Sequence, residues 1–165
     1  MMHKRNGKRG RAIFVVLLSV LLMVACTPQA EAPREHLKLS YRGRDICVGA
    51  EIEPLLAMLG DDYTVAEAES CAGIGRDMVY TYPSLRLYVF APENGVARLT
   101  SAAYTDDGVD VGGVRIGSLA ADVISAIGEP DEKSEQRLLF CDETVTLTFT
   151  LREGRVSAIV LAENE

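Results

Sequence analysis

The sequence predicts an α+β fold of two tandem homologous units, each a short helix packed on an antiparallel sheet of about three strands. An internal repeat is the first observation, because residues 48–61 align without gaps on residues 116–129 at an offset of 68. Residues 98–101 also align on residues 155–158, at an offset of 57. The second observation is that a helical pattern precedes strand patterns in both copies. We therefore place the first unit at residues 39–107 and the second at residues 108–165.

Each copy predicts one short helix. Apolar residues share one helical face in each copy: Leu55, Leu56 and Leu59 in the first, and Val123, Ile124 and Ile127 in the second. Pro54 suits a first helical turn, and Ser118 suits a position that caps a helix N-terminus. Gly60 and Gly128 suit the left-handed residue that ends a helix.

Strands follow each helix. An apolar residue alternates with threonine from Val145 to Leu151, which predicts a strand with one buried face. Leu85, Leu87 and Val89 repeat this spacing in the first copy. The Asn-Gly pair at residues 94–95 and the Glu-Gly pair at residues 153–154 are typical of hairpin turns.

The N-terminus has the three regions of a secretory signal peptide. Residues 1–11 carry five basic residues and no acidic one, residues 12–23 are almost wholly apolar, and Val24 and Ala25 precede Cys26. The apolar run is much shorter than the roughly 20 residues that span a bilayer as a helix. We therefore predict a signal peptide at residues 1–25, with an uncleaved membrane helix as the alternative.

Residues 23–26, Met-Val-Ala-Cys, resemble the lipobox of bacterial lipoproteins, although methionine replaces the usual leucine. The resemblance implies that Cys26 carries lipid and becomes the first residue of an extracytoplasmic, membrane-anchored chain. Residues 26–38 contain two prolines and show no apolar periodicity, so we expect a lipidated tether. The membrane, reached through this lipid, is the first expected partner.

The predicted mature chain is acidic. Five of the 17 basic residues lie in residues 1–25 and none of the 24 acidic ones does, so the remainder carries 12 basic and 24 acidic residues. Such a surface is repelled by the phosphates of nucleic acids, and we expect no nucleic-acid partner. Solubility explains the charge, and a basic partner is the alternative.

The segment from Val114 to Pro130 contains Ile-Gly-Ser, then Asp-Val, then Gly-Glu-Pro, and resembles lipoproteins of the BamE/SmpA kind. Its duplication resembles the β-lactamase inhibitory proteins. A second motif resembles uncharacterised lipoproteins of gut Firmicutes. Its members here are Ser70, Cys71, Ala72, Gly75, Asp77, Tyr80 and Tyr82. The resemblance covers roughly residues 39–163 and implies a fold rather than an activity.

The sequence offers little for catalysis. After residue 25 the only histidine is His36, in the predicted tether, so a triad with a positioned imidazole is excluded. Adjacent carboxylates such as Asp61-Asp62, Asp106-Asp107 and Asp142-Glu143 are more typical of turns than of a cleft. We expect no catalytic residue, no cofactor and no metal site. A hydrolase that uses carboxylates and a purely structural envelope lipoprotein are the alternatives.

Three cysteines remain once Cys26 carries lipid. Cys47 and Cys71 flank the helix of the first copy, and a disulfide between them would stabilise the fold by roughly 3 kcal/mol. Three unpaired thiols are the alternative. Cys141 stands near the start of a strand, where we expect it to be buried.

Aromatic residues concentrate in the first copy and suggest a binding surface. The candidate residues are Tyr80, Tyr82, Arg86, Tyr88 and Phe90. Tyrosine and arginine are enriched at protein interfaces. Burial at the edge of the core, or between two units packed sheet to sheet, is the alternative. The function that we expect is a lipid-anchored, non-catalytic module that binds another protein or an envelope component.

Overall fold

The computed structural model describes residues 37–164, except residues 72 and 107. The predicted signal peptide, Cys26 and nearly all of the predicted tether lie outside the described residues. Among the described residues, no helix is long and apolar enough to cross a membrane. The elements are β1 (Leu39–Tyr41), β2 (Arg44–Ile46), α2 (Ile52–Leu59), β3 (Thr64–Glu69), β4 (Gly75–Thr81), β5 (Leu85–Pro92), β6 (Arg98–Tyr104), β7 (Val109–Asp110), α3 (Ala120–Ile127), β8 (Glu132–Lys133), β9 (Arg137–Cys141), β10 (Val145–Arg152) and β11 (Arg155–Glu163).

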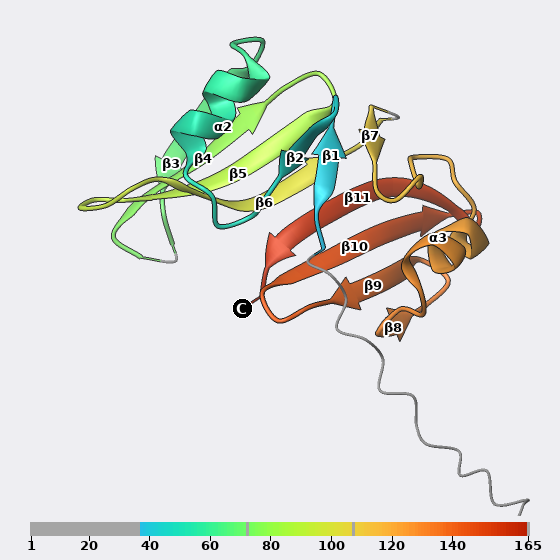
Figure 1. Ribbon diagram of the computed structural model, residues 1–165. Helices are drawn as coiled ribbons and strands as arrows, with labels where there is room; N and C mark the ends of the chain where they lie inside the picture. The colour runs from blue at the N-terminus through green and yellow to red at the C-terminus, as the bar shows by residue number, and fades with distance from the viewer. Residues whose placement is uncertain (1–36, 72, 107, 165) are drawn as a thin grey trace, which may run out of the picture. The chain divides into compact units, whose positions relative to one another are not determined.

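One continuous sheet dominates the structure. Eight antiparallel strands follow the order β3-β4-β5-β6-β11-β10-β9-β8 (Figure 1). Residues 101–104 of β6 pair with residues 159–162 of β11, and this pairing joins the two copies of the repeat. The prediction of two tandem units, each a helix on its own sheet, is therefore wrong. Separate sheets would leave β6 and β11 as two exposed edges, and their pairing removes both.

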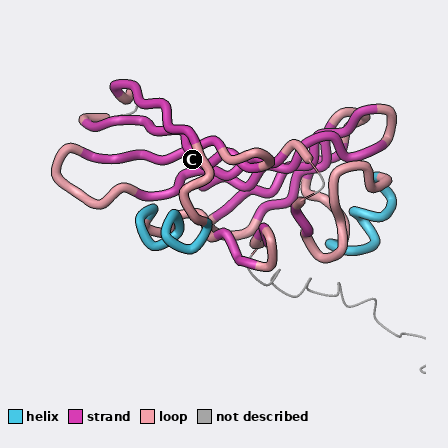
Figure 2. The backbone as a smooth tube through the Cα atoms, turned by 90° about the horizontal axis from the view of Figure 1, so that it is seen from above, coloured by secondary structure: helices cyan, strands magenta, loops and turns pink. Residues whose placement is uncertain are grey.

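The sheet has one covered face and one open face. Alternate residues of the central strands are buried: Leu85, Leu87 and Val89 in β5, and Leu147 and Phe149 in β10, are at most 2% exposed. Ile52 and Leu55 of α2 and Val123 of α3 join the same apolar core. Both helices lie on one side of the sheet (Figure 2). We call that side the helix face and the opposite side the open face.

A small second sheet completes the core. Its strand order is β2-β1-β7, and the pattern of the sequence did not predict these short strands. Leu39, Tyr41 and Ile46 are at most 1% exposed and belong to the same core as the helices. The ring of Tyr41 lies 6.2 Å from that of Tyr104 in β6. The residues after the predicted tether therefore help to cover the helix face.

The repeated segments have matching local structures within the one sheet. Before α2, the Arg98 guanidinium donates to the carbonyl of Gly49 at 2.9 Å. Before α3, the Arg155 guanidinium donates to the carbonyl of Gly117, also at 2.9 Å. In both copies an arginine at the start of a strand thus fixes the glycine that leads into the helix.

Both copies also contain a β-bulge bridged by a hydroxyl group. Thr100 donates to the carbonyl of Tyr88 at 3.0 Å, and Ser157 donates to that of Thr150 at 3.2 Å. The β10–β11 hairpin turns at Glu153 and Gly154, whose φ angles are 53° and 73°. Two successive positive φ angles are typical of the turn that the Glu-Gly pair predicts.

The C-terminal ends of both helices follow the sequence, but the N-terminal cap of α3 does not. Gly60 and Gly128 end the two helices with φ angles of 85° and 104°, as predicted. Ser118 does not cap α3, because its hydroxyl accepts the N–H of Arg115. Instead Asp122, in the first turn of α3, accepts the N–H of Leu119, the residue before the helix, at 3.1 Å. Carboxylates at a helix N-terminus are favoured by the helix dipole as well.

Candidate functional site

The open face is the first candidate site, and the strand register determines its residues. Tyr88 pairs with Val79 of β4 on one side and with Ser101 of β6 on the other. Ser101 pairs with Ala162 of β11, which pairs with Thr146 of β10. Cross-strand partners point to the same face of a sheet. These five side chains therefore form one row across the open face.

Side-chain size changes sharply along this face. The two central strands, β6 and β11, present small side chains, all of them half-buried: Ser101, Ala103, Ala158, Val160 and Ala162. On one side β5 presents Arg86, Tyr88 and Phe90. On the other side β10 presents Thr146, Thr148 and Thr150. The large side chains of β5 thus lie beside a strip of small, mostly apolar side chains on β6 and β11.

The three β5 candidates differ in exposure. Arg86 is exposed, Tyr88 is 37% exposed and Phe90 is half-buried. Tyr88 stands at the bulge, and bulges re-aim side chains locally. The loop after β3 approaches Phe90, because a Cβ atom built on Gly73 would lie 3.5 Å from the edge of the ring. Arg86, Tyr88 and Phe90 form what we call the β5 cluster.

Tyr80 and Tyr82 lie on the helix face and not with the β5 cluster. Tyr80 pairs with the buried Leu87, and its ring lies 5.2 Å from that of Tyr63. Tyr82 is 3% exposed, and its hydroxyl donates to the carbonyl of Gly60 at 3.0 Å. Burial, with a smaller contribution from Tyr63, raises the pKa of Tyr82 to about 12. Both tyrosines thus match the alternative of the sequence analysis, burial at the edge of the core.

The predicted turn carboxylate Asp142 has a structural environment. It accepts the backbone N–H groups of Thr144 at 2.7 Å, Val145 at 2.8 Å and Leu37 at 3.0 Å. Partial burial raises the pKa of Asp142, but these hydrogen bonds outweigh burial and hold the pKa below its ordinary value of 3.8. A carboxylate that stays ionised and saturated with backbone donors suits a turn better than proton transfer.

The predicted disulfide is not formed. Cys47 and Cys71 are both exposed, free thiols. Cys47 leads into Gly49, which bonds to Leu99 of β6, whereas Cys71 follows β3. Three strand spacings separate β3 from β6, roughly 14 Å in all, and a disulfide needs Cα atoms within about 7 Å. Cys141 is exposed rather than buried, because it stands on the open face of β9.

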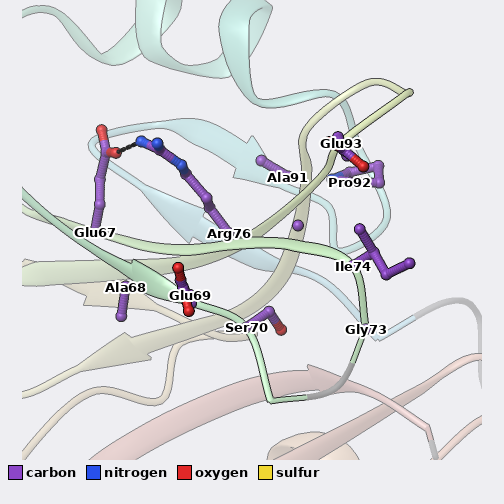
Figure 3. Close-up of a pocket in the computed structure, with 11 residues that line it drawn as sticks. Glu67, Ala68, Glu69, Ser70, Gly73, Ile74, Arg76, Ala91, Pro92 and Glu93 are labelled. Atoms are coloured by element: carbon purple, nitrogen blue, oxygen red, sulfur yellow. Dashed lines mark hydrogen bonds and ion pairs between the residues drawn. The ribbon is translucent and has the colours of Figure 1, made fainter.

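A hollow at the far end of β3 is a site that the sequence analysis missed. It has a volume of about 880 Å³ and lies among the ends of β3 and β5 and the start of β4 (Figure 3). Glu67, Glu69 and Glu93 line it, and Arg76 bonds Glu67 at 2.8 Å. The alternation of alanine and glutamate over residues 66–69 was the available signal, since it places both glutamates on one face of a strand.

Gly75 shapes the wall of this hollow. A Cβ atom on Gly75 would collide with the carbonyl oxygen of Ala91, so only glycine lets β4 begin so close to β5. This contact gives a structural reason for the glycine in the motif that runs from Ser70 to Tyr82. The same motif also supplies Tyr80 and Tyr82 to the core.

Comparison with known proteins finds similar solved structures but no sequence relative. No family model matches the chain, and no curated protein matches it. A similar solved structure is a cysteine-rich secretory protein from Staphylococcus aureus, with a TM-score of 0.52 and 16% sequence identity. The match covers 81% of this chain and 48% of that protein, so the chain spans about half of its length. At this identity the likeness concerns the fold alone.

These findings correct the resemblances of the sequence analysis. The structural neighbour is a secretory protein, and not a BamE/SmpA-like lipoprotein, a β-lactamase inhibitory protein or a Firmicutes lipoprotein with tandem units. Those resemblances depended on glycine and helix-entry motifs, which the structure shows to be local features of one sheet.

Proposed function

We propose that this chain is a lipid-anchored, non-catalytic extracytoplasmic module that binds another protein or an envelope component through the open face of its sheet. The observation that carries the proposal is the exposure of Arg86 and Tyr88, beside the half-buried Phe90, on a face that no described helix covers (Figure 2). Solvated strands more often present threonine, lysine or glutamate, because an exposed aromatic ring has no packing partner.

The two faces of β5 explain why this cluster is available for binding. Leu85, Leu87 and Val89 supply the core from the helix face, so folding does not require Tyr88 or Phe90 to be apolar. Tyrosine and arginine provide large contact areas at low entropic cost. The strip of small residues beside the cluster gives a partner room to approach the backbone of β6 and β11.

The anchor follows from the N-terminal sequence. A cut before Cys26 leaves a short segment before Leu37. The N–H of Leu37 donates a hydrogen bond to the Asp142 carboxylate, at the start of the described residues. Two acyl chains hold a protein firmly at a membrane, at about 0.8 kcal/mol per buried CH₂ group. The secretory nature of the structural neighbour supports export of this chain.

Site-specific photocrosslinking tests the binding surface. A photoreactive amino acid replaces Tyr88 in the full chain, produced in cells of a bacterium that processes lipoproteins. The matched control places it at Glu53, which is exposed on α2. We expect a discrete adduct from position 88 that Phe90→Ala weakens, and no such adduct from position 53. Equal adducts from both positions, or none from position 88, would contradict the proposal.

Lipid labelling tests the anchor in the same cells. We expect Cys26→Ala to abolish incorporation of labelled palmitate and to leave the precursor uncut. Undiminished labelling of that variant would remove the anchor from the proposal. The crosslinking result stays separate, since it compares positions 88 and 53 and does not use the Cys26 variant.

A further inference from the structure

The two edge strands of the large sheet, β8 and β3, differ in length and in protection. At one edge β8 has two residues, Glu132 and Lys133. At the other edge β3 has six residues, pairs with β4 in an unbroken register and is exposed along its whole length. Natural proteins usually protect an edge with short strands, bulges, proline or lysine. The β3 edge has none of these, and its only protection is a pair of glutamates.

The register determines which backbone groups of β3 face outward. The N–H of Ser70 donates to the carbonyl of Gly75, so these two form a hydrogen-bonded pair. In an antiparallel ladder, hydrogen-bonded pairs alternate with non-bonded ones. The backbone groups of Val65, Glu67 and Glu69 therefore point away from β4. They form three consecutive docking positions for an added strand.

The side chains at these positions specify the chemistry of an added strand. Val65 is 48% exposed, and Glu67 forms an ion pair with Arg76 at 2.8 Å. Glu69 makes no ion pair among the residues that the structure describes. Both glutamates line the hollow, together with Glu93 (Figure 3). A residue directly opposite Glu69 or Glu67 would thus meet negative charge beside an open volume.

The same charges argue against a second copy of this chain as the occupant. Antiparallel pairing of these three docking positions with those of another copy places Glu67 opposite Glu67. Like charges directly opposite each other destabilise a sheet. The edge thus disfavours self-association and favours a partner with basic residues.

We propose that β3 binds an extended segment of a partner protein by antiparallel strand addition. The segment carries basic residues opposite Glu69 and Glu67 and an apolar residue opposite Val65, in the order basic-x-basic-x-apolar. Backbone hydrogen bonds supply affinity, and alternate side chains supply specificity. A long basic side chain opposite Glu69 enters the hollow.

A synthetic peptide tests this inference on the full chain. The probe is the acetylated and amidated heptapeptide TKTKTVT, with TETETVT as the charge control. A third peptide carries N-methyl groups at residues 2, 4 and 6, which removes the donors but keeps the side chains. We expect TKTKTVT alone to bind and to shift the NMR signals of the Val65, Glu67 and Glu69 amides. Binding of the N-methylated or glutamate peptide with equal affinity would overturn the inference.

Variants of the chain give an independent test. Val65→Pro removes one outward N–H while keeping the bonds to β4, and Val65→Thr is its matched control. We expect only the proline variant to lose binding. Glu69→Gln should weaken binding about two- to fivefold, the usual range for one cross-strand pair, and Glu143→Lys, remote in the β9–β10 turn, should not. Unchanged affinity for both Val65→Pro and Glu69→Gln would mean that the peptide binds elsewhere, and would overturn the inference.

This test is separate from that of the open face. Tyr88→Ala should leave the affinity for TKTKTVT unchanged, because Tyr88 lies on the other face of the sheet and two strands away from β3. Loss of peptide binding in that variant would contradict the β3 site.

Discussion

The β3–β6 half of the sheet and the β8–β11 half have the same local framework but different surfaces. Each half has a helix entered through an arginine-bound glycine, and each has a bulge bridged by a hydroxyl. On the open face, however, the first half presents Arg86, Tyr88 and Phe90, where the second presents threonines. The comparison separates what the fold requires, which both halves keep, from what they are free to change.

The edges extend this contrast. The second half ends in the two residues of β8, whereas the first ends in the six exposed residues of β3. Both proposed binding surfaces therefore belong to the first half. The second half supplies core and framework, and its exposed strand residues are those of an ordinary solvated sheet.

Core substitutions should have the largest effect on stability, and a similar effect in both halves, since both halves depend on one core. We expect Leu87→Ala and Phe149→Ala to lower the free energy of unfolding by roughly 2–5 kcal/mol each, because both side chains are fully buried. Tyr88→Ala and Thr148→Ala, next to them on the open face, should cost no more than about 1 kcal/mol. Urea denaturation of the four variants measures the difference.

Tyr88→Ala decides the assignment of the open face. A loss of several kcal/mol would mean that the ring packs as a core residue, and the β5 cluster would no longer be a candidate site. Thr148→Ala serves as the control, because it lies on the same face in the other half.

Two turns at matching places give the next largest contrast. Tyr82 N–H donates to Leu85 O in the β4–β5 turn, as Asp142 N–H donates to Val145 O in the β9–β10 turn. In the first turn, the Tyr82 hydroxyl donates a hydrogen bond to the carbonyl of Gly60. In the second, the Asp142 carboxylate accepts hydrogen bonds from backbone N–H groups. We expect Asp142→Ala to cost about 2 kcal/mol, the usual range for hydrogen bonds to a charged group.

The pH dependence of the two turns should have opposite directions. The pKa of Asp142 is lowered in the folded state, so its stabilisation is present above 3.8 and is lost as the pH falls further. The pKa of Tyr82 is raised from 10.0 to about 12, so its stabilisation is lost as the pH rises between those values. The free energy of unfolding of each variant is measured against pH. Asp142→Ala should lose the fall in stability at low pH, and Tyr82→Phe should lose the fall at high pH. If Asp142→Ala keeps the fall at low pH, other groups cause the acid sensitivity.

Local patterns of the sequence predicted local structure well. The strand around Phe149, the turn at residues 153–154 and the helix ends at Gly60 and Gly128 were all predicted, because each depends on near neighbours. The pairing of β6 with β11 was not predicted. Nothing in either strand alone shows that the exposed ladder of one copy meets that of the other.

Long-range placement also limited the prediction of the site. Arg86, Tyr88 and Phe90 share a face, as period-two alternation requires. Tyr80 and Tyr82 obey the same period but belong to the helix face, because the register between β4 and β5 sets their side. The three short strands of the small sheet, and thus the burial of Tyr41, depend on contacts between distant segments.

The smallest expected effect lies where the two halves meet. Tyr104 pairs with Leu85 of β5 and with Ile159 of β11, and it is fully buried. Its hydroxyl has no hydrogen-bond partner among the described residues, and burial raises its pKa. Burying a hydroxyl without a partner costs free energy, so we expect Tyr104→Phe to leave stability unchanged or to raise it by up to about 1 kcal/mol. Thermal and urea unfolding measure the change in stability. Tyr41→Phe is the comparison, because the Tyr41 hydroxyl lies 3.5 Å from Ser84 Oγ. A clear loss of stability in Tyr104→Phe would show that the junction depends on this hydroxyl, and the two halves would then be joined by a polar contact rather than by packing and strand pairing alone.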